Sequence, residues 1–160
     1  MSFGSSFDDQ IERAVGRGLA YLGRRDRTVS ETRSQLKRRG FEEDVIEGAV
    51  ARLIEMEYLD DARFCQRFTE DRRVLDGWGD SRIRHRLSEL GAPRDAIDAV
   101  FEHPSGDELQ RAVAVLEMRL RHPAEAEADR RRAMGLLVRR GYSPQTASDA
   151  IRAHRRAASS

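Results

Sequence analysis

One short pattern recurs three times along this chain: a leucine, three further residues and a glycine. The pairs are Leu36 and Gly40, Leu87 and Gly91, and Leu137 and Gly141. The glycines are 51 and then 50 residues apart, and an uncharged residue follows each of them. Apolar residues also align six and ten positions after each glycine: Ile46, Ile97 and Ala147, then Val50, Phe101 and Ile151. Leu-x-x-x-Gly arises by chance in helical proteins, but four aligned columns in three copies favour stacked copies of one supersecondary unit.

Apolar residues spaced three or four apart predict nine helices, and no stretch has the period of a strand. The clearest apolar stripe is Val45, Ile46, Ala49, Val50, Leu53 and Ile54. Two later stripes are Leu109, Ala112, Val113, Leu116 and Leu120, and Met134, Leu137 and Val138. Stacked repeats contact only their neighbours. We therefore predict an all-α, elongated molecule of three tandem three-helix modules at residues 7–57, 58–103 and 104–156, after a disordered tail at residues 1–6.

Helix-capping residues predict where several helices of these modules begin. Thr28 to Glu31 and Ser105 to Glu108 have the spacing of a capping box, in which a hydroxyl and a carboxylate bond each other's backbone amides. Ser143 followed by Pro144 predicts the start of the last helix.

The middle module has the most distinctive turn. Asp60 or Asp61 is expected to cap its first helix and Asp80 its second, because a carboxylate accepts the free N–H groups of a first turn. Gly77 and Gly79 end the first helix and permit backbone angles that other residues avoid.

Composition limits the classes of function. Charged residues make up 36% of the chain, yet the formal net charge is only +1, so no global field marks a nucleic-acid binder. Lys37 is the only lysine among 29 basic residues. Arginine-favouring codon usage is one explanation, but arginine is also the better side chain for bidentate phosphate and carboxylate contacts.

The N-terminal segment, the apolar stretches and the cysteine count predict where the protein is located and whether it holds disulfides. Residues 1–7 lack an apolar segment, so we expect no signal peptide. No stretch approaches the roughly 18 apolar residues that span a bilayer. The single cysteine, Cys65, excludes an internal disulfide framework. We expect a soluble, cytoplasmic protein.

Nothing in the sequence indicates catalysis, a cofactor or a metal. His85, His103, His122 and His154 are far apart, and none has the i, i+4 spacing of a helical zinc site. The turn at Gly77 and Gly79 lacks the third glycine and the preceding strand of a dinucleotide loop. Asp60 and Asp61 could bind a metal, although helix capping is the simpler interpretation. We therefore predict a binding protein and not an enzyme.

Arginines on helix faces are the candidate binding residues. At 100° per residue, Arg72 lies about 80° from Phe64 and Arg73 about 180° from it, so Arg73 is expected to face water. Arg72 is expected on the side of Asp61, where a structural ion pair is as reasonable as a ligand contact. Arg82 and Arg86 share one flank of the next helix, with Arg84 on the other.

The group Arg82, Arg84 and Arg86 is the densest candidate for binding phosphate or an acidic protein surface. The competing interpretation is a solvated helix with salt bridges, such as one between Arg86 and Glu89. Trp78 is the aromatic residue most expected to be exposed to a partner. Further basic candidates lie at the ends of other helices: Lys37, Arg38, Arg39, Arg139 and Arg140.

The middle module resembles the RecX family, regulators of the bacterial RecA recombinase. The matching residues are Tyr58, Leu59, Asp60, Asp61, Phe64, Phe68, Arg72, Gly77, Gly79, Arg82, Ile83, Leu87 and Gly91. The outer modules match more loosely through the other two leucine–glycine pairs, and the resemblance covers roughly residues 10 to 155. The chain departs from the family in having arginine where lysine is usual, and in its irregular third module around Pro123.

The resemblance implies a curved repeat molecule that lies in the groove of the RecA–single-stranded-DNA filament. It implies inhibition of ATP hydrolysis, strand exchange and filament growth, in DNA repair, recombination and the SOS response. Single-stranded DNA alone is expected to bind weakly, and the protein is expected to be a monomer. Two alternatives stay open: a free-standing DNA-binding protein with a helix-turn-helix in each module, and an adaptor for an acidic protein. Glu31, at the start of a possible reading helix, disfavours the first of these because it would repel phosphate.

Overall fold

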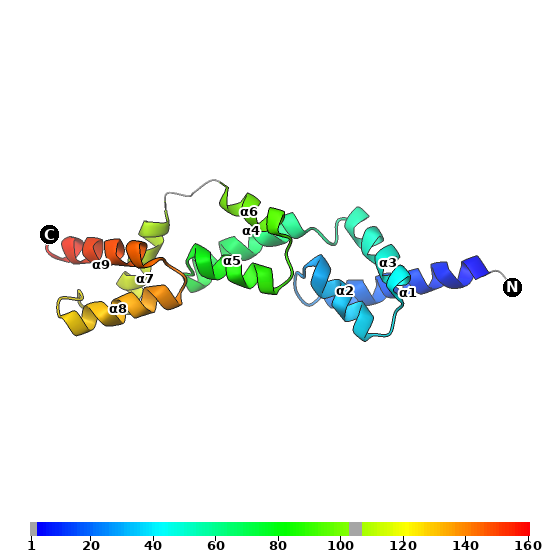
Figure 1. Ribbon diagram of the computed structural model, residues 1–160, viewed down its shortest axis with the longest axis horizontal. Coiled ribbons are helices and arrows are strands. Elements are labelled where there is room, and N and C mark those ends of the chain that lie inside the picture. Colours follow the sequence, from blue (N-terminus) through cyan, green and yellow to red (C-terminus); the bar gives the residue numbers. More distant parts are fainter. Residues whose placement is uncertain (1–2, 103–106) are drawn as a thin grey trace. The chain divides into compact units, whose positions relative to one another are not determined.

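The structure is a computed structural model that describes residues 3–102 and 107–160. The described part consists of helices and connecting turns without a strand, which confirms the all-α prediction (Figure 1). The helices are α1 (Phe3–Leu22), α2 (Val29–Arg38), α3 (Glu43–Glu55), α4 (Asp61–Asp71), the π-helix η1 (Arg72–Asp76), α5 (Asp80–Glu89), α6 (Arg94–Phe101), α7 (Glu108–Arg119), α8 (Glu127–Arg139) and α9 (Pro144–Ala158). The π-helix was not predicted.

The chain's internal contacts divide it into two units, which we describe separately. Unit 1 comprises Met1–Gln66 and Leu87–Ile97, and unit 2 comprises Arg67–Arg86 and Asp98–Ser160. The division passes through α4, α5 and α6 (Arg94–Phe101). The three module boundaries and the elongated shape stay predictions. The predicted tail at residues 1–6 lies partly outside the described residues, and α1 begins at Phe3 rather than at Phe7.

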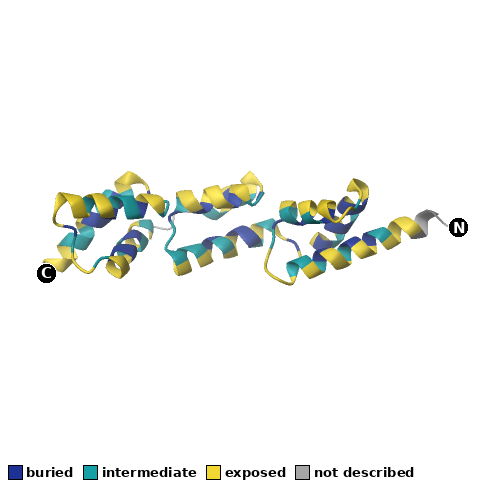
Figure 2. Cartoon of the chain, turned by 90° about the horizontal axis from the view of Figure 1, so that it is seen from below, coloured by how far each residue is buried: buried dark blue, intermediate teal, exposed yellow. Residues whose placement is uncertain are grey.

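The core of unit 1 forms where α1, α2 and α3 pack together. Figure 2 shows buried residues alternating with exposed ones along these helices, as an amphipathic pattern requires. The fully buried side chains include Leu36, Val45, Val50 and Leu53. Burying a side chain of this size stabilises a fold by about 1.5–3 kcal/mol. The predicted stripe of α3 is therefore correct except at Ile54, which is 47% exposed.

The core of unit 2 is built mainly from α7, α8 and α9. Its buried residues include Leu116, Leu137, Ala147 and Ile151. Two predicted core residues are wrong, because Leu109 of α7 and Val138 of α8 are exposed. Val115 is buried instead, so the apolar face of α7 is rotated relative to the prediction.

The three leucine–glycine pairs form the same helix-ending turn, which we call the glycine turn. Gly40, Gly91 and Gly141 have φ angles of 90°, 83° and 99°, in the left-handed region. In each turn the residue after the glycine donates its N–H to the carbonyl of the leucine: Phe41 to Leu36, Ala92 to Leu87 and Tyr142 to Leu137, at 3.0–3.3 Å. This bond defines a Schellman motif and explains the fixed spacing. All three leucines are completely buried.

Two of the glycine turns pack against the start of a helix about 60 residues earlier in the chain. We call the contact of Leu90 and Gly91 with the start of α2 the first junction; it lies within unit 1. There the Thr28 hydroxyl donates to the Leu90 carbonyl at 2.6 Å. The contact of Arg140 and Gly141 with the start of α5 is the second junction, within unit 2. There the Gly79 N–H donates to the Arg140 carbonyl at 2.7 Å.

The helix caps follow most of the predictions. Thr28 and Glu31 form the capping box of α2, and Ser143 caps α9. Asp60 accepts the Arg63 N–H at 3.0 Å and so caps α4. The proposed capping box at Ser105 lies outside the described residues. Asp80 is the first residue of α5, and its carboxylate binds two arginines, as described below.

Candidate functional site

Trp78 lies in the turn between η1 and α5, surrounded by arginine and aromatic side chains of unit 2. The Arg82 guanidinium stacks 4.1 Å from the centre of the indole ring, and that of Arg72 lies 5.8 Å away. Phe68 meets the indole edge-on, with ring centres 6.3 Å apart. Cation–π contacts of this kind each contribute about 0.5–1 kcal/mol at exposed sites. Trp78 is half-buried and already has partners within the chain.

Backbone contacts fix this turn in place. Tyr142 donates its hydroxyl hydrogen to the Gly77 carbonyl at 2.9 Å, and burial raises the pKa of that hydroxyl. Arg140 donates to the Asp76 carbonyl, and Arg82 donates to the Arg139 carbonyl at 3.1 Å. Side chains that the sequence suggested for a partner therefore also hold the second junction together.

Arg73 does not face water, so the predicted orientation is wrong. Its guanidinium binds the Asp80 carboxylate at 2.8 Å and lies 5.6 Å from the Phe101 ring, and its side chain is only 18% exposed. Arg111 binds the same carboxylate at 3.3 Å. The turn at Gly77 and Gly79 brings Asp80, the first residue of α5, back beside Arg73, and the helical rotation of the preceding residues does not show this approach.

The ion pair suggested for Arg72 exists, but with another partner. Its guanidinium binds the Asp76 carboxylate at 2.5 Å. Asp61, the expected neighbour, accepts the Val29 N–H at 3.0 Å instead, and burial raises the pKa of its carboxyl. Arg72 is therefore part of the local structure around Trp78.

The three arginines of α5 are exposed, yet each has a contact within the chain. Arg84 binds the Asp98 carboxylate at 2.9 Å and stacks 4.5 Å from the Phe101 ring. Arg86 also interacts within the chain, and Arg82 stacks on Trp78. These contacts are on the surface, where an ion pair contributes about 0–1 kcal/mol, so a partner can compete with them.

The other basic candidates lie at glycine turns. Lys37, Arg38 and Arg39 are exposed at the end of α2, and Arg38 donates to the Gln35 side chain at 3.0 Å. Arg139 is exposed at the end of α8, whereas Arg140 is half-buried at the second junction. Of all these candidates, the structure brings Arg72, Trp78, Arg82, Arg139 and Arg140 together, and it places Lys37, Arg38 and Arg39 in the other unit.

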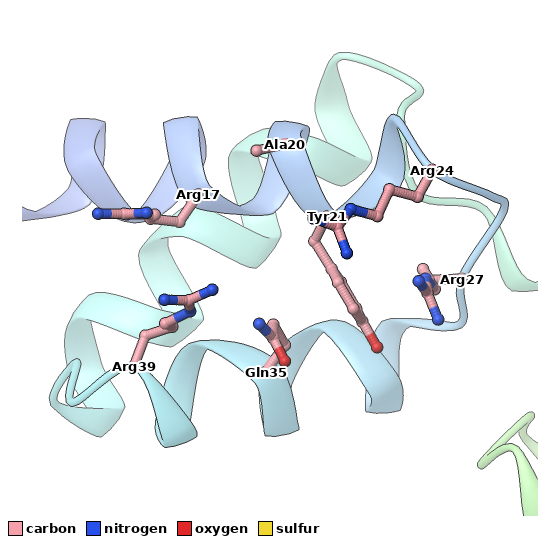
Figure 3. Close-up of a pocket in the computed structure, with 7 residues that line it drawn as sticks. All are labelled: Arg17, Ala20, Tyr21, Arg24, Arg27, Gln35 and Arg39. Atoms are coloured by element: carbon pink, nitrogen blue, oxygen red, sulfur yellow. The ribbon is translucent and has the colours of Figure 1, made fainter.

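A further group of arginines, which the sequence analysis missed, lines a groove in unit 1 (Figure 3). We call it the arginine groove: a cavity of about 230 Å³ bordered by Arg17, Ala20, Tyr21, Arg24, Arg27, Gln35 and Arg39. Arg27 stacks 4.1 Å from the centre of the Tyr21 ring. A sequence signal existed, because Arg13, Arg17 and Tyr21 are each four residues apart and share one face of α1.

Neither a cluster of metal ligands nor an exposed thiol is found among the described residues. No group of three or more potential metal ligands occurs among them. Cys65 is completely buried, and burial raises the pKa of its thiol to about 11, which disfavours the reactive thiolate. No helix in the described part is both long and apolar enough to cross a membrane.

The fold and these surfaces define an all-helical repeat protein with arginine-rich surfaces. A family model described as "RecX, first three-helix domain" matches residues 14–53, and one described as "RecX, second three-helix domain" matches residues 60–100. The chain belongs to the RecX family of regulatory proteins.

Relatives named regulatory protein RecX align with most of the chain. The one from Trichlorobacter lovleyi is 36% identical over 84% of this chain and 88% of its own length. The one from Prosthecochloris aestuarii is 31% identical over 87% of this chain and 91% of its own length. The crystal structure of RecX from Lactobacillus salivarius superimposes with a TM-score of 0.80, covering 92% of this chain and 97% of that one, at 18% identity. This likeness shows the shared fold.

Proposed function

We propose that this protein binds the RecA–single-stranded-DNA filament and inhibits the recombinase's ATP hydrolysis, strand exchange and filament growth in the cytoplasm. The observation that carries the proposal is family membership, since relatives named regulatory protein RecX align with 84–88% of the chain. The protein acts by binding rather than by catalysis, as a monomer that needs no cofactor. Direct affinity for naked single-stranded DNA is weaker than affinity for the filament.

The exposed flank of α5 is the part of unit 2 that we propose contacts the filament. Arg82 and Arg86 are four residues apart, so their side chains emerge on the same side of the helix. Guanidinium groups pair with carboxylates and phosphates through two parallel hydrogen bonds. A recombinase filament carries both kinds of acceptor, on its protein surface and on its DNA.

Charge reversal at this flank tests the proposal. We expect Arg82→Glu combined with Arg86→Glu to abolish inhibition of the recombinase's DNA-dependent ATPase, because like charges brought together cost several kcal/mol. The fold loses contacts worth about 1 kcal/mol each. Helicity and melting temperature are measured on the same samples.

Two controls isolate the surface from the fold. Arg131→Glu with Arg132→Glu makes the same charge change on exposed residues of α8 and should leave inhibition intact. Arg72→Glu should lower the melting temperature first, because Arg72 holds Asp76 and packs near Trp78. If the α5 variant stays folded and inhibits as the parent does, the contact lies at the edges Lys37–Arg39 or Arg139–Arg140.

Binding to three targets side by side separates this function from a free-standing DNA-binding protein. The targets are naked single-stranded DNA, free recombinase and the assembled filament. A filament regulator binds the assembled filament most tightly. Affinity for naked DNA that equals affinity for the filament and persists at high salt would favour the DNA-binding alternative, because nonspecific phosphate contacts weaken steeply with salt.

A further inference from the structure

We propose that the arginine groove of unit 1 binds single-stranded DNA directly, with its arginines on successive phosphates and Tyr21 against one base. The proposal rests on the weak direct affinity for single-stranded DNA that the proposed function includes, and it names the surface that supplies this affinity. No residue of the groove belongs to the flank of α5.

Positive charge is continuous along the groove. A second cavity of about 600 Å³ adjoins the first and shares Arg17, Ala20 and Arg39 with it. This second cavity adds Arg13 at one end, and Arg24 and Arg27 border the other end of the first. Neither cavity has an acidic residue in its lining. The result is an uninterrupted track of five guanidinium groups.

The arginines of the track differ from their neighbours in lacking carboxylate partners. Just outside the track, Arg25 pairs with Glu31 at 3.2 Å and Arg33 with Glu47 at 2.8 Å. Within the described part of the chain, no ion pair involves Arg13, Arg17, Arg24, Arg27 or Arg39. The chain has 28 acidic residues, so carboxylates are plentiful elsewhere. Unpaired like charges in one groove repel each other, and a bound polyanion removes that repulsion.

The spacing of these charges fits a chain of phosphates better than one isolated phosphate. Arg13, Arg17 and Tyr21 lie on one face of α1, and a rise of 1.5 Å per residue separates each from the next by about 6 Å along the axis. An isolated phosphate, as on a modified peptide, needs guanidinium groups that converge on one point. Here Arg13 borders only the second cavity, and Arg24 and Arg27 border only the first, so the guanidinium groups are spread along both cavities, as an extended nucleic-acid backbone requires.

Tyr21 supplies a stacking surface inside this track. Figure 3 shows its ring extending from α1 toward α2, with Arg27 on one side and Gln35 and Arg39 on the other. The Arg27 guanidinium covers one face at 4.1 Å, and its Nε is buried without a hydrogen-bond partner among the described residues. One face of the ring is therefore in contact with Arg27, and Tyr21 lines the cavity together with Gln35. Aromatic rings in positive grooves stack unpaired bases of any sequence.

Stacking also selects the single strand over the duplex. Bases in a duplex are stacked on each other, so their faces are not available to a side chain in a groove. The site we propose therefore takes single-stranded DNA without sequence preference.

Fluorescence anisotropy with a labelled oligothymidine strand and the full-length protein tests the phosphate contacts. Arg17→Ala with Arg39→Ala should weaken binding at low salt at least tenfold. It should also reduce the slope of log affinity against log salt by about 1.4, since each single-strand phosphate contact contributes about 0.7. Arg131→Ala with Arg132→Ala removes the same charge from α8 and should change affinity less than twofold. Circular dichroism checks that both variants melt as the parent does.

Tyr21 is tested by substitution and by photocrosslinking. Tyr21→Leu should weaken binding about 5-fold to 150-fold through loss of stacking, whereas Tyr21→Phe should retain it. A strand containing 5-iodouracil should crosslink to the peptide that contains Tyr21. Inorganic pyrophosphate and a mononucleotide serve as competitors, and they should displace the strand only at far higher concentrations than unlabelled oligothymidine.

Several results would overturn the proposal. Crosslinking at Trp78 but not at Tyr21 would place the base contact in unit 2. Equal losses of affinity in the groove and α8 variants would mean that DNA binding depends only on the net charge of the protein and not on the groove. Competition by pyrophosphate at the same concentration as the oligonucleotide would make the groove a site for small phosphates. Unchanged DNA binding with lost filament binding would make it a protein-docking surface. The proposed ATPase inhibition is scored separately, so either proposal can fail alone.

Discussion

The two junctions both join a glycine turn to the start of an earlier helix, but they use different hydrogen-bond donors. In both, the carbonyl before a glycine accepts a hydrogen bond from the residue at the start of an earlier helix. That donor is the Thr28 hydroxyl in the first junction and the Gly79 backbone N–H in the second. Thr28 and Gly79 are 51 residues apart, and the glycines of the turns that they meet, Gly91 and Gly141, are 50 apart. A buried threonine side chain can therefore replace a direct contact between two backbones.

The absence of a side chain at Gly79 permits a closer approach at the second junction. A Cβ atom there would lie 2.5 Å from the carbonyl of Gly141, so the two turns meet backbone to backbone. At the first junction Thr28 fills the equivalent position. The glycine turn of Gly40 differs from both, because a Cβ added there meets nothing within 4 Å among the described residues. Its glycine is needed for its φ angle alone. Substituting the three glycines by alanine therefore distinguishes two contributions to the free energy of unfolding. One is the strain of the left-handed backbone, present at all three, and the other is the steric clash, present only at the junctions.

The largest effect is expected for Gly141→Ala. An alanine at φ 99° is strained, and its Cβ would lie 2.6 Å from the backbone nitrogen of Arg82. Backbone cannot move aside as a side chain can, so we expect a loss of about 3–5 kcal/mol of unfolding free energy. Urea unfolding followed by circular dichroism measures it. A loss below that of Gly40→Ala would mean that the second junction does not hold in solution.

A smaller loss is expected for Gly91→Ala, about 2–3 kcal/mol, because the clash is with the Ser30 side chain. The new Cβ would lie 2.5 Å from both Cβ and Oγ of Ser30. Ser30→Gly removes both atoms, so the double variant should recover part of the loss. A double-mutant cycle gives the coupling free energy. Strict additivity of the two substitutions would contradict the contact.

Gly40→Ala isolates the conformational cost. With φ 90° and open space around it, we expect a loss of about 1–2 kcal/mol from the left-handed backbone alone. The measurement is the same urea titration. Gly40→Asn is the matched control, because asparagine tolerates this region better than alanine and should lose less. An effect as large as that of Gly141→Ala would imply a third junction at this turn.

The repeat could be predicted from sequence because its cause is local. A left-handed residue after a buried leucine leaves a leucine–glycine signature whatever the turn packs against. Amphipathic periods likewise gave the helices, although Leu109, Val138 and Ile54 are exposed where the stripes predicted burial. The junctions could not be predicted, because the pairing of Thr28 with Leu90 depends on packing between segments 62 residues apart.

The candidate site was predictable only in part, for a similar reason. Sequence shows where arginines are, but a carboxylate brought close by the fold decides which of them are paired. Arg73 was expected to face water, yet the turn after η1 brings the Asp80 carboxylate beside it. Conversely, the face of α1 that carries Arg13, Arg17 and Tyr21 shows the helical period in sequence, but only α2 makes a groove of it by adding Arg39.

The smallest expected effect concerns Tyr142, which occupies the place of Phe41 and Ala92 in the other glycine turns. Tyr142→Phe removes the hydrogen bond to Gly77 and should cost about 0.5–1.5 kcal/mol at neutral pH. Burial raises the folded-state pKa of Tyr142 above its ordinary value of 10.0. Its contribution is therefore complete below pH 10 and is lost as the pH rises further, because the unfolded state releases the proton first.

The parent should consequently lose stability more steeply than Tyr142→Phe above pH 10, and the two curves should converge. Cys65, whose pKa is raised from 9.0 to about 11, also weakens the fold over pH 9 to 11, but it is present in both proteins and cancels in the difference. Tyr58→Phe, at an exposed tyrosine, is the control and should follow the parent. Parallel curves for the parent and Tyr142→Phe would mean that the hydroxyl is solvated, and that the second junction lacks the tyrosine contact which distinguishes it from the first.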